Sequence, residues 1–136
     1  MTEDEVIDAV IGFLEDKGWI IESRCTAQQH GEDIVALRNG DRLVIEAKGA
    51  SSSKPHTNRY GFEFSTGQIF DHVAKAILKA LRVVGRRETR TAVALPDNDG
   101  HREEIKQVHD ALRRLDISVF WVSSDGKVTV DMVGQP

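Results

Sequence analysis

The sequence predicts an α/β fold with a mixed central sheet and helices packed on its faces. Three observations predict it: an opening run of apolar residues at helical spacing, a pair of apolar strands joined at Asn39-Gly40, and helices that alternate with strands after residue 64. A hairpin followed by helix–strand alternation is typical of such a sheet. At 136 residues, the chain is expected to form a single domain over 1–136.

The first half of the chain is expected to form one helix and three strands. Apolar residues recur at helical spacing over 2–16, and Lys17-Gly18 ends this helix. Asn39-Gly40 between two apolar runs is the strongest short hairpin signal, because both residues tolerate positive φ. The predicted strands cover 19–26, 33–38 and 42–48.

The second half is expected to be a loop over 49–64, then helices alternating with strands. A helix over 65–84 is predicted to pack through Ile69, Val73, Ala76, Ile77, Ala80, Leu81 and Val84. A strand over 91–95 stops at a proline, and one further helix carries Ile105, Val108, Leu112 and Leu115. Two last strands are predicted over 117–122 and 128–130.

The composition is that of an ordinary globular protein, with 40% hydrophobic and 29% charged residues. The single cysteine, Cys25, excludes an internal disulfide and a cysteine-rich zinc site. No apolar run is long enough to span a bilayer, and the acidic residues 3–5 are unlike a targeting segment. We therefore expect a cytoplasmic protein that does not bind membranes.

Charge is unevenly distributed along the chain. The net charge of −4 argues against a protein that coats nucleic acid non-specifically. However, residues 48–90 hold nine basic and three acidic side chains. Phosphate binding requires local positive potential and not a basic total. The segment is either a phosphate-binding surface or a solvated helix face, and charge alone favours neither.

The hairpin brings two acidic residues together. With Asn39 and Gly40 as turn residues, each position on one strand has a defined partner on the other, and Asp33 faces Glu46. Opposed residues have Cβ atoms about 4.5–5.5 Å apart. Lys48 lies two residues beyond Glu46 and therefore points to the same face.

Two opposed carboxylates repel each other, so the fold must offset that repulsion. A divalent cation does so, since Mg²⁺ favours one or two carboxylates together with waters and substrate phosphate. A neighbouring ammonium group such as that of Lys48 holds the attacking water or neutralises charge on phosphorus. The residue types predict metal-assisted phosphodiester hydrolysis. The alternative is that Asp33, Glu46 and Lys48 form the solvent face of an ordinary hairpin.

The stretches GEDIVA at 31–36 and VIEAKG at 44–49 resemble the PD-(D/E)XK nuclease signature. This superfamily includes many restriction endonucleases and the archaeal Holliday junction resolvases. The resemblance covers residues 3–95 and implies a restriction endonuclease-like α-β-β-β-α-β core, here extended by the C-terminal helix and two strands. It implies that Asp33 and Glu46 bind Mg²⁺, for which Mn²⁺ substitutes, and that Lys48 assists the nucleophilic water. Glu32 stands where the family name has proline.

Further site residues are expected on the two helices. Members of the family often add an acid from the first helix, and Glu3 is favoured over Glu5 and Asp8 because it shares the core-facing stripe. Gln68 either lies near the metal, as in some members, or closes a capping box with Ser65. His72, one turn later, either faces the site or packs elsewhere on the surface.

The expected activity is DNA cleavage. We expect phosphate contacts from Lys54, Arg59, Lys75 and Lys79, extended by Arg82, Arg86, Arg87 and Arg90. A homodimer is expected by analogy with small relatives, since one site cuts one strand. The alternatives are a catalytically silent nucleic-acid-binding or regulatory module with the same fold, and an unrelated α/β protein whose hairpin happens to match.

Overall fold

The structure of the protein is a computed structural model that describes residues 1–25, 31–51 and 64–131. Within these ranges, no helix is both long enough and apolar enough to cross a membrane. The helices are α1 (Glu3–Asp16), α2 (Thr66–Val83), α3 (Asp99–Lys106) and α4 (His109–Arg114). The strands are β1 (Ile20–Arg24), β2 (Ile34–Arg38), β3 (Asp41–Ala47), β4 (Thr89–Pro96), β5 (Ile117–Val122) and β6 (Val128–Asp131).

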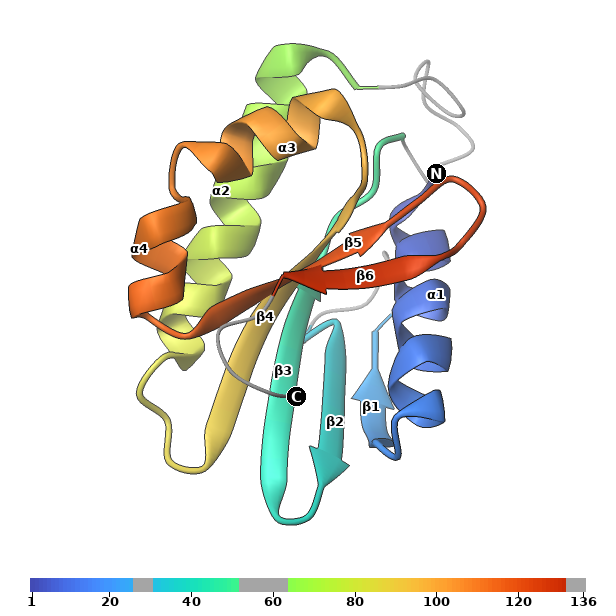
Figure 1. The fold of residues 1–136 in the computed structure, drawn as a ribbon, viewed down its shortest axis with the longest axis vertical. Coiled ribbons are helices and arrows are strands. Elements are labelled where there is room, and N and C mark those ends of the chain that lie inside the picture. Colours follow the sequence, from blue (N-terminus) through green and yellow to red (C-terminus); the bar gives the residue numbers. More distant parts are fainter. Residues whose placement is uncertain (26–30, 52–63, 132–136) are drawn as a thin grey trace.

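One six-stranded sheet holds the described strands in the order β1-β2-β3-β4-β5-β6. Strands β3, β4 and β5 are parallel to one another, and the other neighbours pair antiparallel. Helix α1 lies on one face of the sheet and α2, α3 and α4 lie on the other (Figure 1). The predicted fold class, a mixed sheet flanked by helices with the order α-β-β-β-α-β through β4, is confirmed.

The β2–β3 hairpin has the predicted register. Asn39 and Gly40 both adopt positive φ, 52° and 84°. The pairs run from Arg38 opposite Asp41 to Ile34 opposite Ile45. A shift of one residue would move every side chain to the other face of the sheet. The turn therefore determines which side chains of β2 and β3 share a face.

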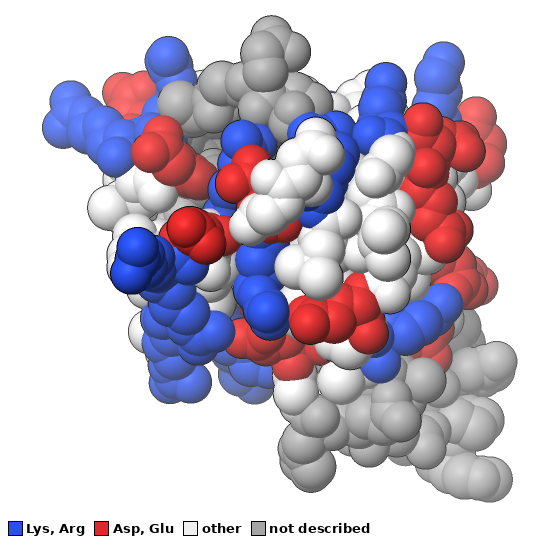
Figure 2. All heavy atoms as spheres, turned by 90° about the horizontal axis from the view of Figure 1, so that it is seen from below, with Lys and Arg blue, Asp and Glu red and all other residues white. Residues whose placement is uncertain are grey.

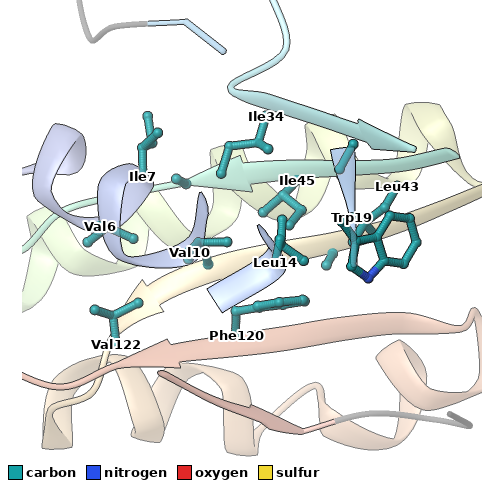
Figure 3. Packing of buried hydrophobic residues seen from close by; sticks show 14 residues of the cluster. Val6, Ile7, Val10, Leu14, Trp19, Ile34, Leu43, Ile45, Phe120 and Val122 are labelled. Carbon is teal, nitrogen blue, oxygen red and sulfur yellow. The ribbon is translucent and has the colours of Figure 1, made fainter. Parts of the chain in front are cut away.

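Alternation along β3 separates two hydrophobic cores. Leu43 and Ile45 pack under α1, together with Val10, Leu14 and Phe120 (Figure 3). Val44, on the opposite side of the strand, packs with Val35 and Val83 of α2, and a larger cluster joins α2, α3 and α4 to β4 and β5. Because Glu46 follows Val44 by two residues, its side chain lies on the α2 face.

The structure corrects two expectations in the second half of the chain. The C-terminal helical segment is two short helices, α3 and α4, because the backbone at Val108 leaves the helical region at φ −123° and ψ 9°. This break lets Ile105 of α3 and Leu112 of α4 reach the same core cluster. Leu81, expected on the packed face of α2, is 42% exposed, and Val83 is buried instead.

Candidate active site

Asp33 lies at the open end of the hairpin, just before β2 begins. The β2–β3 ladder ends one pair earlier, at Ile34 and Ile45. The side chain of Asp33 turns towards β3, and its Oδ2 accepts a hydrogen bond of 2.8 Å from the backbone N–H of Ala47. The carboxylate is 8% exposed. This bond holds the carboxylate against the end of β3, beside Glu46.

Glu46 is the most deeply buried acid among the described residues, at 3% exposure. Its Oε2 has no hydrogen-bond partner within the described part of the chain. Burial, and then the charge of Asp33, raise the pKa of Glu46 to about 7. A buried carboxylate oxygen without a hydrogen bond is costly, so this oxygen is suited to a cation.

Glu3 is the acid of α1 that reaches the site. Its pKa is raised to about 7, by burial first and then by the charge of Asp33, while Lys48 acts in the opposite direction. The rival acids are engaged elsewhere: the side chain of Glu5 caps α1 by accepting from Thr2 N at 3.1 Å, and Asp8 pairs with Arg24 at 2.7 Å. Glu3 is therefore close enough to the site for the charges of Asp33 and Lys48 to act on it.

The position of Glu3 depends on Gly49. A Cβ built on Gly49 would lie 2.4 Å from the backbone nitrogen of Glu3. The next two residues, Ala50 and Ser51, donate backbone hydrogen bonds of 2.8 and 3.1 Å to the carbonyl oxygen of Met1. The end of β3 and the start of α1 are thus in backbone contact, which only a residue without a side chain permits.

Two lysines balance the acids. Lys48 is half-buried, and its backbone N–H bonds to the Ala94 carbonyl, extending the β3–β4 pairing beyond the strand. Lys79 of α2 places its Nζ 3.8 Å from Glu46 Oε2, an ion pair too long to be a hydrogen bond. Lys79 was expected only at phosphates. The sequence could have indicated this position of Lys79. It lies three residues after Ala76 and four before Val83, which are both buried, so it borders the face of α2 that packs on the sheet.

Gln68 forms the capping box at the start of α2. Its Oε1 accepts from Ser65 N at 2.8 Å, and its own backbone N–H donates to Ser65 Oγ at 3.3 Å. The sequence left two roles open for Gln68, a capping box and a place near the metal, and the structure shows the capping box. A role for Gln68 near the metal stays a prediction.

His72 lies next to the site and not on the open surface. It is half-buried, and its ring meets Phe64 edge-on at 4.5 Å between centroids. Burial, followed by the charges of Lys48 and Lys75, lowers the pKa of His72. Behind it, His101 is fully buried, and its Nδ1 lies 2.8 Å from Asn98 Oδ1. Burial likewise lowers the pKa of His101, to about 4, so both shifts favour the neutral form of the ring.

The predicted phosphate-binding residues fall into two groups. Lys54 and Arg59 lie outside the described residues. Lys75 and Lys79 are both on α2, four residues apart, and are exposed. Further along, Arg86 pairs with Glu32 at 2.8 Å, so part of the positive charge after α2 is neutralised within the protein.

The donor set fits a hard divalent cation. Asp33 and Glu46 supply adjacent carboxylates on one face, and the buried Glu46 Oε2 has no hydrogen-bond partner among the described residues. Among the described residues, no group of three or more His, Cys, Asp or Glu side chains is arranged to enclose a metal. Two carboxylates are nevertheless the usual protein contribution to a Mg²⁺ site that is completed by waters and phosphate. The fitting ligands are therefore Asp33 and Glu46, with Glu3 close by.

Comparison with known proteins supports the fold. No family model matches the sequence. No curated protein matches it either. Among solved structures, the protein is similar to an FdxN element excision controlling factor protein from Anabaena variabilis, at 14% sequence identity and a TM-score of 0.50. The match covers 96% of this chain and 99% of that one. At this identity the likeness shows a shared α/β fold, consistent with a restriction endonuclease-like core.

Proposed function

We propose that this protein is a metal-dependent endonuclease of the PD-(D/E)XK type that hydrolyses phosphodiester bonds in DNA. The observation that carries this proposal is the buried Oε2 of Glu46 beside Asp33, which has no hydrogen-bond partner among the described residues. Burial and like charge both oppose ionisation of Glu46, and the ion pair with Lys79 at 3.8 Å offsets them only in part, since the pKa of Glu46 is still raised. The name of the structurally similar protein refers to element excision, but the likeness supports the fold and not that role.

The residues have separate tasks in this proposal. Asp33 and Glu46 hold Mg²⁺, and the Ala47 N–H keeps Asp33 in position. The chemistry that a bound Mg²⁺ supplies is polarisation of a phosphoryl oxygen and a lowered pKa of its water. The ammonium group of Lys48 orients the attacking water and neutralises the charge that develops on the phosphate. Lys79 limits the repulsion between the acids when the site carries no cation.

One site cuts one strand, so we propose that a homodimer supplies the second site for double-strand cleavage. Mass measurement of the protein in solution, with and without duplex DNA, tests this part alone. A monomer that nicks but never cuts both strands together contradicts the dimer and leaves the nuclease intact.

The decisive experiment is a cleavage screen on labelled single-stranded, duplex, flapped and four-way DNA with Mg²⁺ or Mn²⁺. We expect Asp33→Ala to lower the rate by at least 10³-fold and Lys48→Ala by about 10²-fold or more. Asp110→Ala and Lys127→Ala, which change exposed charges elsewhere, are the matched controls. Cleavage that survives Asp33→Ala, or DNA binding without cleavage under either metal, contradicts the proposal; the second result identifies a silent binding module.

A further inference from the structure

Helix α2 carries hydrophobic side chains on two of its sides. One side packs on β3, β4 and α3, and its buried members are Val73, Ala76, Ala80 and Val83. Away from that side, the fold leaves three large hydrophobic residues in water: Phe70 is 56% exposed, Leu78 52% and Leu81 42%. One apolar side is enough to pack a helix within a monomer. A second one that stays exposed indicates an interaction surface.

The exposed residues form one continuous row, which we call the outer row of α2. Its members, Phe70, Ala74, Leu78 and Leu81, follow one another at intervals of three or four residues and are all exposed. Side chains at these intervals share one face of a helix. Single exposed hydrophobic residues are common on protein surfaces, whereas a row of them at this spacing is typical of a helix that packs against another helix.

Two charged residues border the outer row, one near each end of α2. Asp71 follows Phe70 and Arg82 follows Leu81, so both lie beside the row and on the same side of it. Both are exposed, and neither forms an ion pair with another residue in the described part of the chain. They cannot pair with each other, because about 16 Å of helix separates them. Each charge is therefore available to a partner.

Charge is distributed unequally along α2. The acid Asp71 comes first, and the basic residues Lys75, Lys79 and Arg82 follow it. Figure 2 views the molecule from the end at which α2 finishes, and it shows basic side chains gathered on the side where α2 and α4 lie in Figure 1. Two copies of α2 that ran in the same direction would bring like charges together at this end. An antiparallel pair places the basic end of each helix beside the acid near the start of the other.

The outer row is complementary to itself when a second copy is rotated by half a turn. With the two α2 helices antiparallel, Ala74 lies opposite Leu78 of the partner subunit, and Phe70 lies opposite the partner's Leu81. A small residue opposite a large one lets the helices approach closely. In the same register, Asp71 lies within one residue of the partner's Arg82, and symmetry repeats this pair at the other end. An interface between identical copies requires this kind of self-complementarity.

We propose that the outer row of α2 binds the outer row of a second copy of this chain and forms an antiparallel, two-fold symmetric dimer. A contact of one helix from each copy is small, so the dimer is weak. Its two-fold axis is perpendicular to the plane of the helix pair, so both Lys79 side chains, and the Glu46 carboxylates that they contact, lie on the same side of that plane. That two sites on one side serve one duplex is a consequence that rests on the proposed nuclease function.

Sedimentation of the whole chain, without metal or DNA, tests the surface. We expect a monomer–dimer equilibrium with a dissociation constant between about 10 µM and 1 mM, as for a small interface. Leu78→Glu puts a charge into the centre of the row and should raise this constant about tenfold or more. The matched control is Ile20→Glu, which changes a hydrophobic residue that is 71% exposed on β1 and should leave the constant unaltered.

Exchange of the two bordering charges tests the antiparallel pairing. Asp71→Arg alone and Arg82→Asp alone each place like charges together at both ends of the dimer, so each should raise the dissociation constant about fivefold or more. The double variant should restore the original constant, and a mixture of the two single variants should form a heterodimer. Glu15→Arg, at an exposed position of α1 on the other face of the sheet, should leave the equilibrium unchanged.

Thermal unfolding of each variant at low concentration, where the monomer predominates, shows that the substitutions act on association and not on folding. A chain that is monomeric at 1 mM, a dimer that survives Leu78→Glu, or single charge variants that dimerise as well as the double variant would each overturn the proposal. Because sedimentation needs neither metal nor DNA, an inactive protein that dimerises through the outer row would contradict the nuclease alone.

Discussion

The carboxyl group of Glu46 is held where its charged form is least stable. It is buried at 3% exposure, next to a second acid, and one of its oxygens has no hydrogen-bond partner among the described residues. The consequence is a pKa near 7, well above the ordinary value of 4.5. A group with a raised folded-state pKa stabilises the fold when protonated, and this contribution is lost as pH rises through the folded-state value. The site therefore weakens the metal-free protein above neutral pH.

Glu46→Gln should reveal this cost. The amide imitates the protonated acid, so at pH 8 in EDTA we expect the variant to be more stable than the unaltered protein by roughly 1–3 kcal/mol. At pH 4.5 the difference should fall to near zero, because Glu46 is then protonated. Urea unfolding at the two pH values measures this. Glu103→Gln, at an exposed position of α3, is the control and should show no such trend. An equal effect at both pH values would contradict the burial argument.

Metal binding should be pH-dependent for the same reason. Ligation requires ionised carboxyl groups, so binding of Mn²⁺ must displace the protons that Glu46 and Glu3 retain near neutral pH. We expect the affinity for Mn²⁺ to increase at least tenfold between pH 6 and pH 8, with proton release visible by calorimetry in buffers of different ionisation enthalpy. Affinity that is constant over this range would show that the acids are already ionised.

At the scale of the elements, the start of α1, the end of β3 and the start of α2 assemble the site. Each helix begins with a complete capping box, Thr2 with Glu5 in α1 and Ser65 with Gln68 in α2. These boxes satisfy backbone N–H groups that would otherwise lack partners. The close approach at Gly49 then brings α1 against β3. The capping box at Thr2 and the close contact with Gly49 both involve the first turn of α1, which carries Glu3. Together they hold Glu3 near the other acids.

Gly49→Ala should separate α1 from the site. The added Cβ would lie 2.4 Å from Glu3 N, a distance that backbone atoms must move to relieve. We expect a loss of about 1–3 kcal/mol in stability, as for other overpacked positions, together with reduced cleavage. Gly67→Ala is the matched control, because nothing lies within 4 Å of its Cβ and alanine favours the helix. An unchanged midpoint of thermal unfolding in Gly49→Ala would contradict the contact.

Substitutions of Gln68 distinguish its two possible roles, as a cap of α2 and as a residue near the metal. Glutamate also serves at the third position of a capping box, so Gln68→Glu should keep the stability, whereas Gln68→Ala should lose about 0.5–2 kcal/mol. If Gln68 acts only as a cap, Gln68→Glu should also leave DNA cleavage within about twofold of the original rate. A loss of activity without a loss of stability would favour the role near the metal.

At the scale of the whole molecule, the net charge is negative, but exposed lysines of α2 lie near the acidic residues of the site. The protein carries a net charge of −4, yet its site is followed in sequence by α2 with exposed Lys75 and Lys79. Several other arginines are engaged in ion pairs with acids, including Arg42 with Glu22 and Arg102 with Asp97. The positive potential that remains near the site is therefore local. If the proposed function holds, DNA phosphates are expected at Lys75 and Lys79.

The salt dependence of DNA binding should report these contacts. In EDTA, where no cleavage occurs, we expect Lys75→Ala to reduce the slope of log affinity against log salt by about 0.9, the value for one lost phosphate contact. Lys17→Ala, at the exposed C-terminal end of α1 and the opposite end of the sheet from the acids, should leave the slope unchanged. Fluorescence anisotropy with a labelled duplex measures both. Equal slopes for the two variants would place Lys75 outside the DNA interface.

The fold class, the order of the elements through β4 and the hairpin register follow from the sequence alone. Asn39-Gly40 admits one tight turn, and that turn places Asp33 next to Glu46 with the side chains of alternate residues on one face. These are local properties of strand and turn geometry. They depend on residues that are close together in the chain, and a sequence pattern predicts such local structure well.

How the remaining side chains meet the site depends on the tertiary structure. The sequence favoured Glu3 over Glu5 and Asp8, but the approach of Glu3 to Asp33 depends on how α1 docks against the sheet. The same is true of the ion pair of Lys79 with Glu46 and of the break between α3 and α4. Docking is set by packing between residues far apart in the chain, and a periodic pattern specifies which face is buried but not what it meets.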